Sequence, residues 1–244
     1  MKRETQNILL ILLGGALVKI AVNGDYLRYV KPAQQPWIIA GGAVMVLLGA
    51  VAVVRDLLAV RAKAAAAPDH DEHHEHSHSA RPAWLLLVPV LAVFLVAPPA
   101  LGADSVLRTE ARVPASAAAA NAAAFPPLPT GNVVPLTVNE FVSRAGWDAA
   151  GTLDNRTVSL TGFIVHTGGR TLLARLVISC CAADAFPVTV HLRGGEADYL
   201  ASDAWIRVTG QVVPGTATKD NSYTPDFTLA SMATVPAPKD PYEY

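Results

Sequence analysis

Apolar residues gather in three long stretches within the first hundred positions, and polar loops separate them. The stretches cover residues 7–22, 37–54 and 84–103. A helix that crosses the hydrocarbon core of a bilayer needs about 20 mostly apolar residues. The second and third stretches come close to that length and contain no charged residue. The pattern therefore predicts a membrane region over residues 1–104 with three spanning helices.

The first stretch is the shortest of the three and contains Lys19. A lysine near the end of a helix can extend its ammonium group to the lipid headgroups, so this stretch can still span. A cleaved signal peptide is the alternative, because Lys2 and Arg3 precede the apolar run. No small-x-small cleavage site follows that run, which favours the uncleaved span.

Positive residues are distributed unequally between the loops. The N-terminus and the second loop carry Lys2, Arg3, Arg55, Arg61, Lys63 and Arg81, whereas the first loop carries Arg28 and Lys31. Loops rich in lysine and arginine stay in the cytoplasm. We therefore expect a multi-pass protein with a cytoplasmic N-terminus, and three crossings would make everything after about residue 104 extracytoplasmic.

Alanine and proline dominate residues 105–135, which predicts an extended linker without a core of its own. The next segment begins with Thr137 and Glu140, the Thr-x-x-Glu pattern of a helix N-terminal capping box. Apolar residues follow it at helical spacing. We expect one short amphipathic helix from Val138 to about Ala145.

From Arg156 onward the apolar residues alternate with polar ones, as in strands with one buried face. After this first strand, a turn at Gly168-Gly169 leads to four more, expected over Thr171–Ser179, Ala185–Arg193, Ala204–Val213 and Phe227–Val235, with a helical turn possible at Glu196–Ala201. The predicted fold class is membrane-anchored α + β: transmembrane helices, then a five-stranded OB-like barrel over residues 136–238 and a tail over 239–244. A small β-sandwich is the alternative.

Composition agrees with a membrane protein, because 52% of the residues are hydrophobic and 16% are charged. The net charge of −1 gives no argument for binding nucleic acid. The two cysteines are adjacent in sequence, which excludes a framework of several intramolecular disulfides.

The string Ser179-Cys180-Cys181-Ala182-Ala183-Asp184 ends the second predicted strand in two thiols and a carboxylate. Thiolates suit zinc or copper(I), and Asp184, His166 or His191 could add further ligands. Neighbouring side chains of a regular strand point to opposite faces, so both sulfurs reach one ion only if the chain bends. Two alternatives remain: a vicinal disulfide acting as a redox switch, and simple packing of both cysteines.

A second group of metal-binding residue types lies in the loop over residues 69–78. It contains His70, His73, His74, His76 and His78 together with four carboxylates. Imidazoles and carboxylates bind zinc, nickel or cobalt without a defined fold. The loop could capture or buffer metal ions on the cytoplasmic side, or it could be a solvated segment whose histidines titrate near pH 6.5.

His166 and His191 each stand alone in a predicted strand, where an ordinary structural histidine is the commoner case. The sequence shows no catalytic triad order, no phosphate loop and no His-Glu-x-x-His motif. We therefore expect a protein that is not an enzyme.

Three segments resemble the bacterial YcgQ-like family of permease subunits: Asp25–Pro32, Leu173–Ala185 and Ala204–Gly210. The Cys-Cys-Ala-Ala-Asp-Ala run is the most specific of them. The resemblance implies a bacterial cell-membrane protein that works with a polytopic permease, and it implies no substrate. Cys180, Cys181 and Asp184 match the family motif, whereas the histidine-rich loop has no counterpart in the resemblance.

Together these patterns lead to one main hypothesis of function. It is an accessory subunit of a membrane permease, possibly in transition-metal handling, with an extracytoplasmic domain that binds a ligand or a metal such as zinc. An envelope redox or stress sensor that uses the cysteine pair is the first alternative. A structural interaction module is the second.

Overall fold

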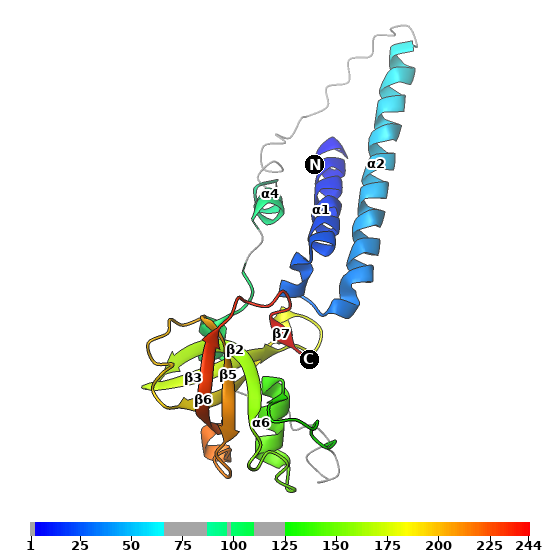
Figure 1. Ribbon diagram of the computed structural model, residues 1–244. Helices are drawn as coiled ribbons and strands as arrows, with labels where there is room; N and C mark the ends of the chain where they lie inside the picture. The colour runs from blue at the N-terminus through cyan, green and yellow to red at the C-terminus, as the bar shows by residue number, and fades with distance from the viewer. Residues whose placement is uncertain (1–2, 66–86, 97–98, 110–124) are drawn as a thin grey trace. The chain divides into compact units, whose positions relative to one another are not determined.

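The computed structural model describes residues 3–65, 87–96, 99–109 and 125–244 of the 244-residue chain (Figure 1). It divides the chain into two compact units. The first consists of Met1–Tyr26 and Pro32–Pro99, and the second of Leu27–Lys31 and Ala100–Tyr244. The histidine-rich loop at 69–78 lies outside the described residues.

Two long helices form most of the first unit, α1 (Arg3–Asn23) and α2 (Gln35–Ala65). They contain two candidate membrane spans, Gln6–Asn23 and Pro32–Ala62, by length and apolar composition. The first two apolar stretches are therefore helical, as the sequence predicts. The direction in which the helices would cross a bilayer stays a prediction.

Glycines bring α1 and α2 close together along their length (Figure 1). A Cβ atom added at Gly42 would lie 2.9 Å from the backbone oxygen of Gly14, and one added at Gly14 would lie 2.7 Å from the oxygen of Gly42. Small residues allow helix backbones to approach in this way in membranes. The side chains of Asn7 and Asp56 add a polar contact, in which Nδ2 donates to Oδ2 at 3.0 Å.

The third apolar stretch differs from the prediction of one spanning helix over 84–103. Its described residues form the nine-residue helix α4 (Leu87–Leu95), and its end begins a different helix, α5 (Ala103–Arg108), in the second unit. Ala103 and Val106 are buried there, and Asp203 Oδ1 accepts a hydrogen bond of 2.6 Å from the Ala103 N–H. The apolar end of the stretch thus covers a sheet, which hydrophobicity alone does not distinguish from a span.

The second unit is built on a seven-stranded mixed sheet. Its strands are β1 (Val134–Pro135), β2 (Val158–Thr167), β3 (Arg170–Val177), β4 (Phe186–Arg193), β5 (Trp205–Val212), β6 (Asp226–Thr234) and β7 (Tyr242–Glu243). All five predicted strands are confirmed, with ends shifted by at most three residues. The segment expected to form a helical turn after β4 makes hydrogen-bonded turns instead.

The five long strands pair in a continuous cycle. β2 pairs with β3, β3 with β4, β4 with β6, β6 with β5, and β5 again with β2. Every pairing is antiparallel except that of β4 with β6. The short strands add parallel edges, β1 to β2 and β7 to β3.

Side chains of β2 and β3 are buried on both faces. In β2, Leu160 and Ile164 belong to one apolar cluster, whereas Phe163 and Val165 belong to a second. Helix α6 (Val138–Trp147) packs into the first cluster and α5 into the second. Half of the predicted capping box of α6 is present, because Thr137 Oγ1 accepts from the Glu140 N–H at 3.0 Å. The Glu140 carboxylate accepts from Arg144 at 2.9 Å, which is one turn further along the helix.

Both ends of the predicted domain extend further than the sequence indicates. The proposed linker over 105–135 begins inside α5 and ends in β1, so its described ends are parts of the folded unit. The proposed tail over 239–244 contains β7, whose Tyr242 and Glu243 are buried. Strands of two residues carry too little alternation to be recognised.

Glu243 makes a buried ion pair with Arg175 of β3, in which Oε1 lies 3.4 Å from Nε. Its carboxylate also accepts the N–H groups of Val138 and Asn139 at 2.9 and 2.7 Å, at the start of α6. The guanidinium of Arg175 stacks over the ring of Trp205 at 4.9 Å. Burial raises the pKa of Glu243, although these hydrogen bonds and Arg175 act in the opposite direction.

We predict that Glu243→Ala lowers the free energy of unfolding by about 3–5 kcal/mol, because it leaves the buried Arg175 charge without its partner. Pulse proteolysis of the full chain in urea and mild detergent measures this change. Glu196→Ala, at an exposed position, is the matched control. Equal stability of the two variants would contradict the role of the pair.

We predict that Gly42→Val lowers the stability of the first unit by about 1–3 kcal/mol, because the added atoms overlap the backbone of α1. Gly41→Val is the control, since a Cβ at Gly41 meets nothing within 4 Å. Thermal unfolding in detergent micelles should separate the two variants, and the same melting temperature for both would refute close α1–α2 packing.

Candidate functional site

The chain bends sharply where β3 ends, and the bend brings the cysteine string together. We call residues 179–184 the Cys loop. After Cys181 the loop forms a short 3-10 turn (Ala182–Asp184). The Asp184 carboxylate folds back and accepts the N–H groups of Ser179 and Cys180, each at 2.8 Å. The bend that shared ligation by both cysteines requires is therefore present.

The three side chains Cys180, Cys181 and Asp184 converge on one side of this loop. Their candidate ligand atoms all lie within 4.8 Å of one another, and the two sulfurs are 3.5 Å apart. Two sulfurs bound tetrahedrally to one zinc ion lie about 3.8 Å apart, given Zn–S bonds of ~2.3 Å. The arrangement thus requires little movement to surround an ion. Cys180 and Asp184 are exposed and Cys181 is half-buried, so an ion can reach them from solvent.

Both cysteines are free thiols, and Asp184 affects the pKa of Cys180. Hydrogen bonds to the Asp184 carboxylate and to Cys181 raise the pKa of the Cys180 thiol to about 11. Partial burial acts to raise the pKa of Asp184, but hydrogen bonds from the Cys180 thiol and from the backbone N–H groups of the loop outweigh it and lower that pKa. At neutral pH the site therefore combines a carboxylate with a protonated Cys180.

A segment from far away in the sequence pairs with the Cys loop. We call residues 27–31 the connector, because they follow α1 and precede α2. The Ala182 N–H donates to the Tyr29 oxygen at 2.7 Å, and the Lys31 N–H donates to the Cys180 oxygen at 3.4 Å. Val30 and Cys181 form an antiparallel bridge. The connector belongs to the second unit for this reason, and no local sequence signal predicts the pairing.

His166 and His191 do not supplement the cysteines. They lie opposite Thr171 and Leu172, near the start of β3, whereas Cys180 follows the end of that strand. Seven or more residues at ~3.3 Å each separate the two places by more than about 20 Å. His166 bonds Leu200 O at 2.7 Å through Nε2, and His191 Nδ1 pairs with Asp226 at 2.6 Å.

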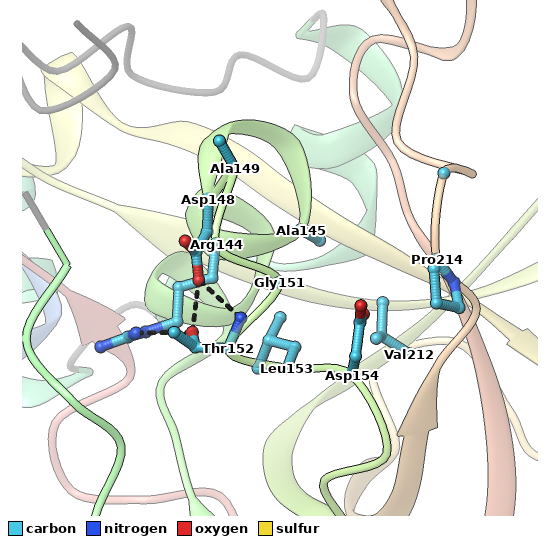
Figure 2. A pocket seen from close by; sticks show the side chains of 11 residues that line it. Arg144, Ala145, Asp148, Ala149, Gly151, Thr152, Leu153, Asp154, Val212 and Pro214 are labelled. Atoms are coloured by element: carbon cyan, nitrogen blue, oxygen red, sulfur yellow. Dashed lines mark hydrogen bonds between the residues drawn. The ribbon is translucent and has the colours of Figure 1, made fainter. Parts of the chain in front are cut away.

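A pocket of about 250 Å³ lies at the C-terminal end of α6, lined by Arg144, Asp148 and Asp154 among others (Figure 2). The charged groups of Arg144 and Asp148 are already engaged within the protein. Arg144 bonds Glu140, Thr152 and the Pro126 oxygen. The Asp148 carboxylate accepts the Thr152 N–H at 2.9 Å. The residues that line this pocket therefore stabilise the end of α6, and the Cys loop is the better candidate site.

We predict that Asp184→Asn speeds alkylation of Cys180 by iodoacetamide at pH 8.5 by about tenfold or more, because loss of the carboxylate charge lowers the thiol pKa and raises the thiolate fraction. Both proteins should also carry Cys181→Ser, so that one thiol reacts. The control is Asp220→Asn in the same background, which should react like the parent. Equal rates for the Asp184 and Asp220 variants would show that Asp184 does not govern the thiol.

Comparison with known families gives two matches. Residues 5–110 match the DUF1980 N-terminal domain, and residues 148–244 match the DUF1980 C-terminal domain. The first match contains α1, the connector and α2, and the second contains β2 to β7 with the Cys loop. No curated protein matches the chain. The chain thus carries both domains of the DUF1980 family, in the order and combination of a DUF1980 family protein.

Proposed function

We propose that this protein is a membrane-anchored accessory subunit of a permease that binds a thiophilic transition-metal ion, such as zinc, at Cys180, Cys181 and Asp184. One observation carries the proposal: two thiols and a carboxylate converge within 4.8 Å on an exposed, bent loop. The two domain matches name no activity, so the chemistry of the loop is the main support.

The donor set favours an exchangeable metal site over a permanent one. Structural zinc sites have four protein ligands, whereas sites that react or exchange keep a position open. This loop supplies three ligands. A fourth position would remain for water or for a ligand from a partner, which suits a protein that accepts an ion and passes it on. Soft thiolates select zinc or copper(I) over magnesium and calcium.

We further propose that the cycle of five strands is a small OB-like barrel. The order of pairings supports this, since β2 bonds both β3 and β5 and so returns the sheet to its first strand. In such barrels the face of the second and third strands binds ligands, together with the loops that follow the first and fourth strands. The Cys loop joins β3 and β4, the second and third strands of the cycle.

The partner permease is supported by the membrane helices and the family resemblance. Both α1 and α2 are long and apolar enough to span a bilayer. A path for an ion through a membrane needs polar groups along its length, and the candidate spans in α1 and α2 are mostly apolar. A polytopic partner would supply that path, with the Cys loop on the extracytoplasmic side as the loop charges predict.

The redox sensor is the second candidate, and the 3.5 Å between the two sulfurs favours it. A disulfide requires an S–S bond of ~2.05 Å, so oxidation would need a modest approach of the two side chains. Mass spectrometry of protein isolated without reductant distinguishes the candidates. A mass lower by about two daltons across the cysteine peptide supports the sensor.

We predict that the full-length protein binds one zinc ion per chain at the Cys loop, and that Cys180→Ser with Cys181→Ser abolishes this binding. All proteins should carry asparagine in place of the five histidines of the 69–78 loop, so that only one class of site remains. Asp184→Asn should weaken binding at least about tenfold, and Asp220→Asn is the matched control. Competition with a chromophoric chelator measures the affinity.

Retention of the full zinc stoichiometry in the double serine variant would overturn the metal site. The permease role has its own test, which is metal accumulation in cells together with copurification of a polytopic partner. Normal expression with unchanged accumulation in the double serine variant would exclude a transport role for the cysteines.

A further inference from the structure

We infer that the connector senses the occupancy of the Cys loop: a metal ion at Cys180, Cys181 and Asp184 locks the backbone pairing of residues 29–31 with the loop. The inference rests on the proposed function, since it requires that the loop binds metal. It adds a regulatory output to that site, located in the segment of chain between α1 and α2.

Three backbone contacts join the connector to the loop at a metal ligand or beside one. Lys31 donates to the backbone oxygen of Cys180, Val30 bridges Cys181, and Tyr29 accepts from Ala182. The loop thus presents its side chains to the ion and its backbone to the connector. A change in loop conformation on one side cannot leave the hydrogen bonds on the other side unaffected.

The other parts of the connector are fixed to the folded unit. The Tyr242 hydroxyl donates to the Arg28 oxygen at 3.0 Å and accepts from the Leu101 N–H at 3.2 Å. The Lys31 ammonium lies over the ring of Tyr244 at 5.1 Å. Tyr242 belongs to β7 and Tyr244 follows it, and β7 bonds the chain just before the loop, where the Ile178 N–H donates to the Glu243 oxygen at 3.0 Å. These contacts hold Arg28 and the Lys31 side chain to the second unit, so the backbone pairing of residues 29–31 can open while they remain.

Without an ion, this pairing should open readily. The paired connector residues are half-buried and Cys180 is exposed. A bridge of so few residues belongs to the less stable part of a fold, where amide hydrogens exchange through local opening. The loop itself is held in shape by the Asp184 carboxylate on Ser179 and Cys180. An ion that ligates both sulfurs and this carboxylate prefers the closed loop, and a ligand that prefers one state shifts the population toward it.

The size of the effect follows from linkage. If metal binds only the closed state, closure is favoured by the factor 1 + [L]/Kd, which is about 100-fold at a metal concentration of 100 Kd. The connector follows α1, which ends at Asn23, and precedes α2, which begins at Gln35. Closure of the pairing therefore fixes the segment that joins the two candidate spans. A permease partner that contacts this segment would detect the change.

We predict that Zn²⁺ slows exchange of the Lys31 amide, which donates to the Cys180 oxygen, by up to about 100-fold at 100 Kd. The peptide over residues 27–34 reports this amide. The full-length protein in detergent micelles, with the histidine-rich loop replaced by asparagines, is followed by hydrogen exchange and mass spectrometry. Peptides from the centre of β2 and β5 are the internal reference and should not change. Chelation of the zinc should restore the original exchange rate.

Ala182→Pro tests the route of the coupling. It removes the N–H that bonds Tyr29, and the site tolerates proline because Ala182 is the first residue of a helical turn and Cys181 before it is extended (φ −155°, ψ 168°). We expect this variant to bind one zinc ion while its connector exchanges fast with or without zinc. Ala182→Gly keeps the N–H and should behave like the parent.

The possible results separate the two proposals. Failure of the parent protein to bind zinc overturns the proposed function. Zinc binding without slower connector exchange overturns the coupling and leaves the proposed function in place. Unchanged zinc-dependent protection in Ala182→Pro also overturns the coupling. Zinc binding and connector closure are coupled reciprocally, so each should affect the other by the same factor. If Ala182→Pro lowers zinc affinity by a larger factor than it lowers connector protection, the coupling is also overturned.

Discussion

The buried ion pair between Arg175 and Glu243 holds together parts of the second unit that the chain order keeps far apart. Glu243 comes from the last strand and caps the start of α6, while Arg175 stacks on Trp205 of β5. A buried charge without a partner costs several kcal/mol, so each of these elements must stay in register for the pair to survive. The pair also determines where β3 stops, because β7 accompanies β3 as far as Ile178 and the Cys loop begins one residue later.

The long strands could be predicted because alternation is a local property that each strand carries by itself. The ends of the domain could not. Ala103 and Val106 look like the end of an apolar span, yet they cover the sheet, and Glu243 looks like part of a charged tail, yet it is buried. In both cases the residues that bury the segment lie more than 50 positions away in sequence, and hydrophobicity alone does not identify them.

The same distinction applies to the candidate site. Cys180, Cys181 and Asp184 are close in sequence, so one turn brings them together. They could be predicted because cysteine and aspartate are residue types that bind metals. The positions of His166 and His191 could be predicted only with the strand register, which places them at the opposite end of β3. The pairing of the connector with the Cys loop spans about 150 positions of sequence. Tyr29, Val30 and Lys31 contribute backbone groups to it, which every residue possesses, so their side chains give no signal of the pairing.

The geometry of Asp184 bears on the choice between a metal site and a redox switch. Disulfide exchange begins with a thiolate, and a carboxylate beside a thiol opposes thiolate formation. Here the Asp184 carboxylate raises the pKa of Cys180 to about 11, so that thiol is a slow nucleophile near neutral pH. Reactive cysteines of redox proteins lie beside positive charges or helix N-termini instead. The same carboxylate, placed at ligand distance from two sulfurs, attracts a cation. Metal binding also requires thiolates, but the ion itself displaces the thiol protons as it binds. The position of Asp184 therefore supports the proposed cation site over the proposed redox switch.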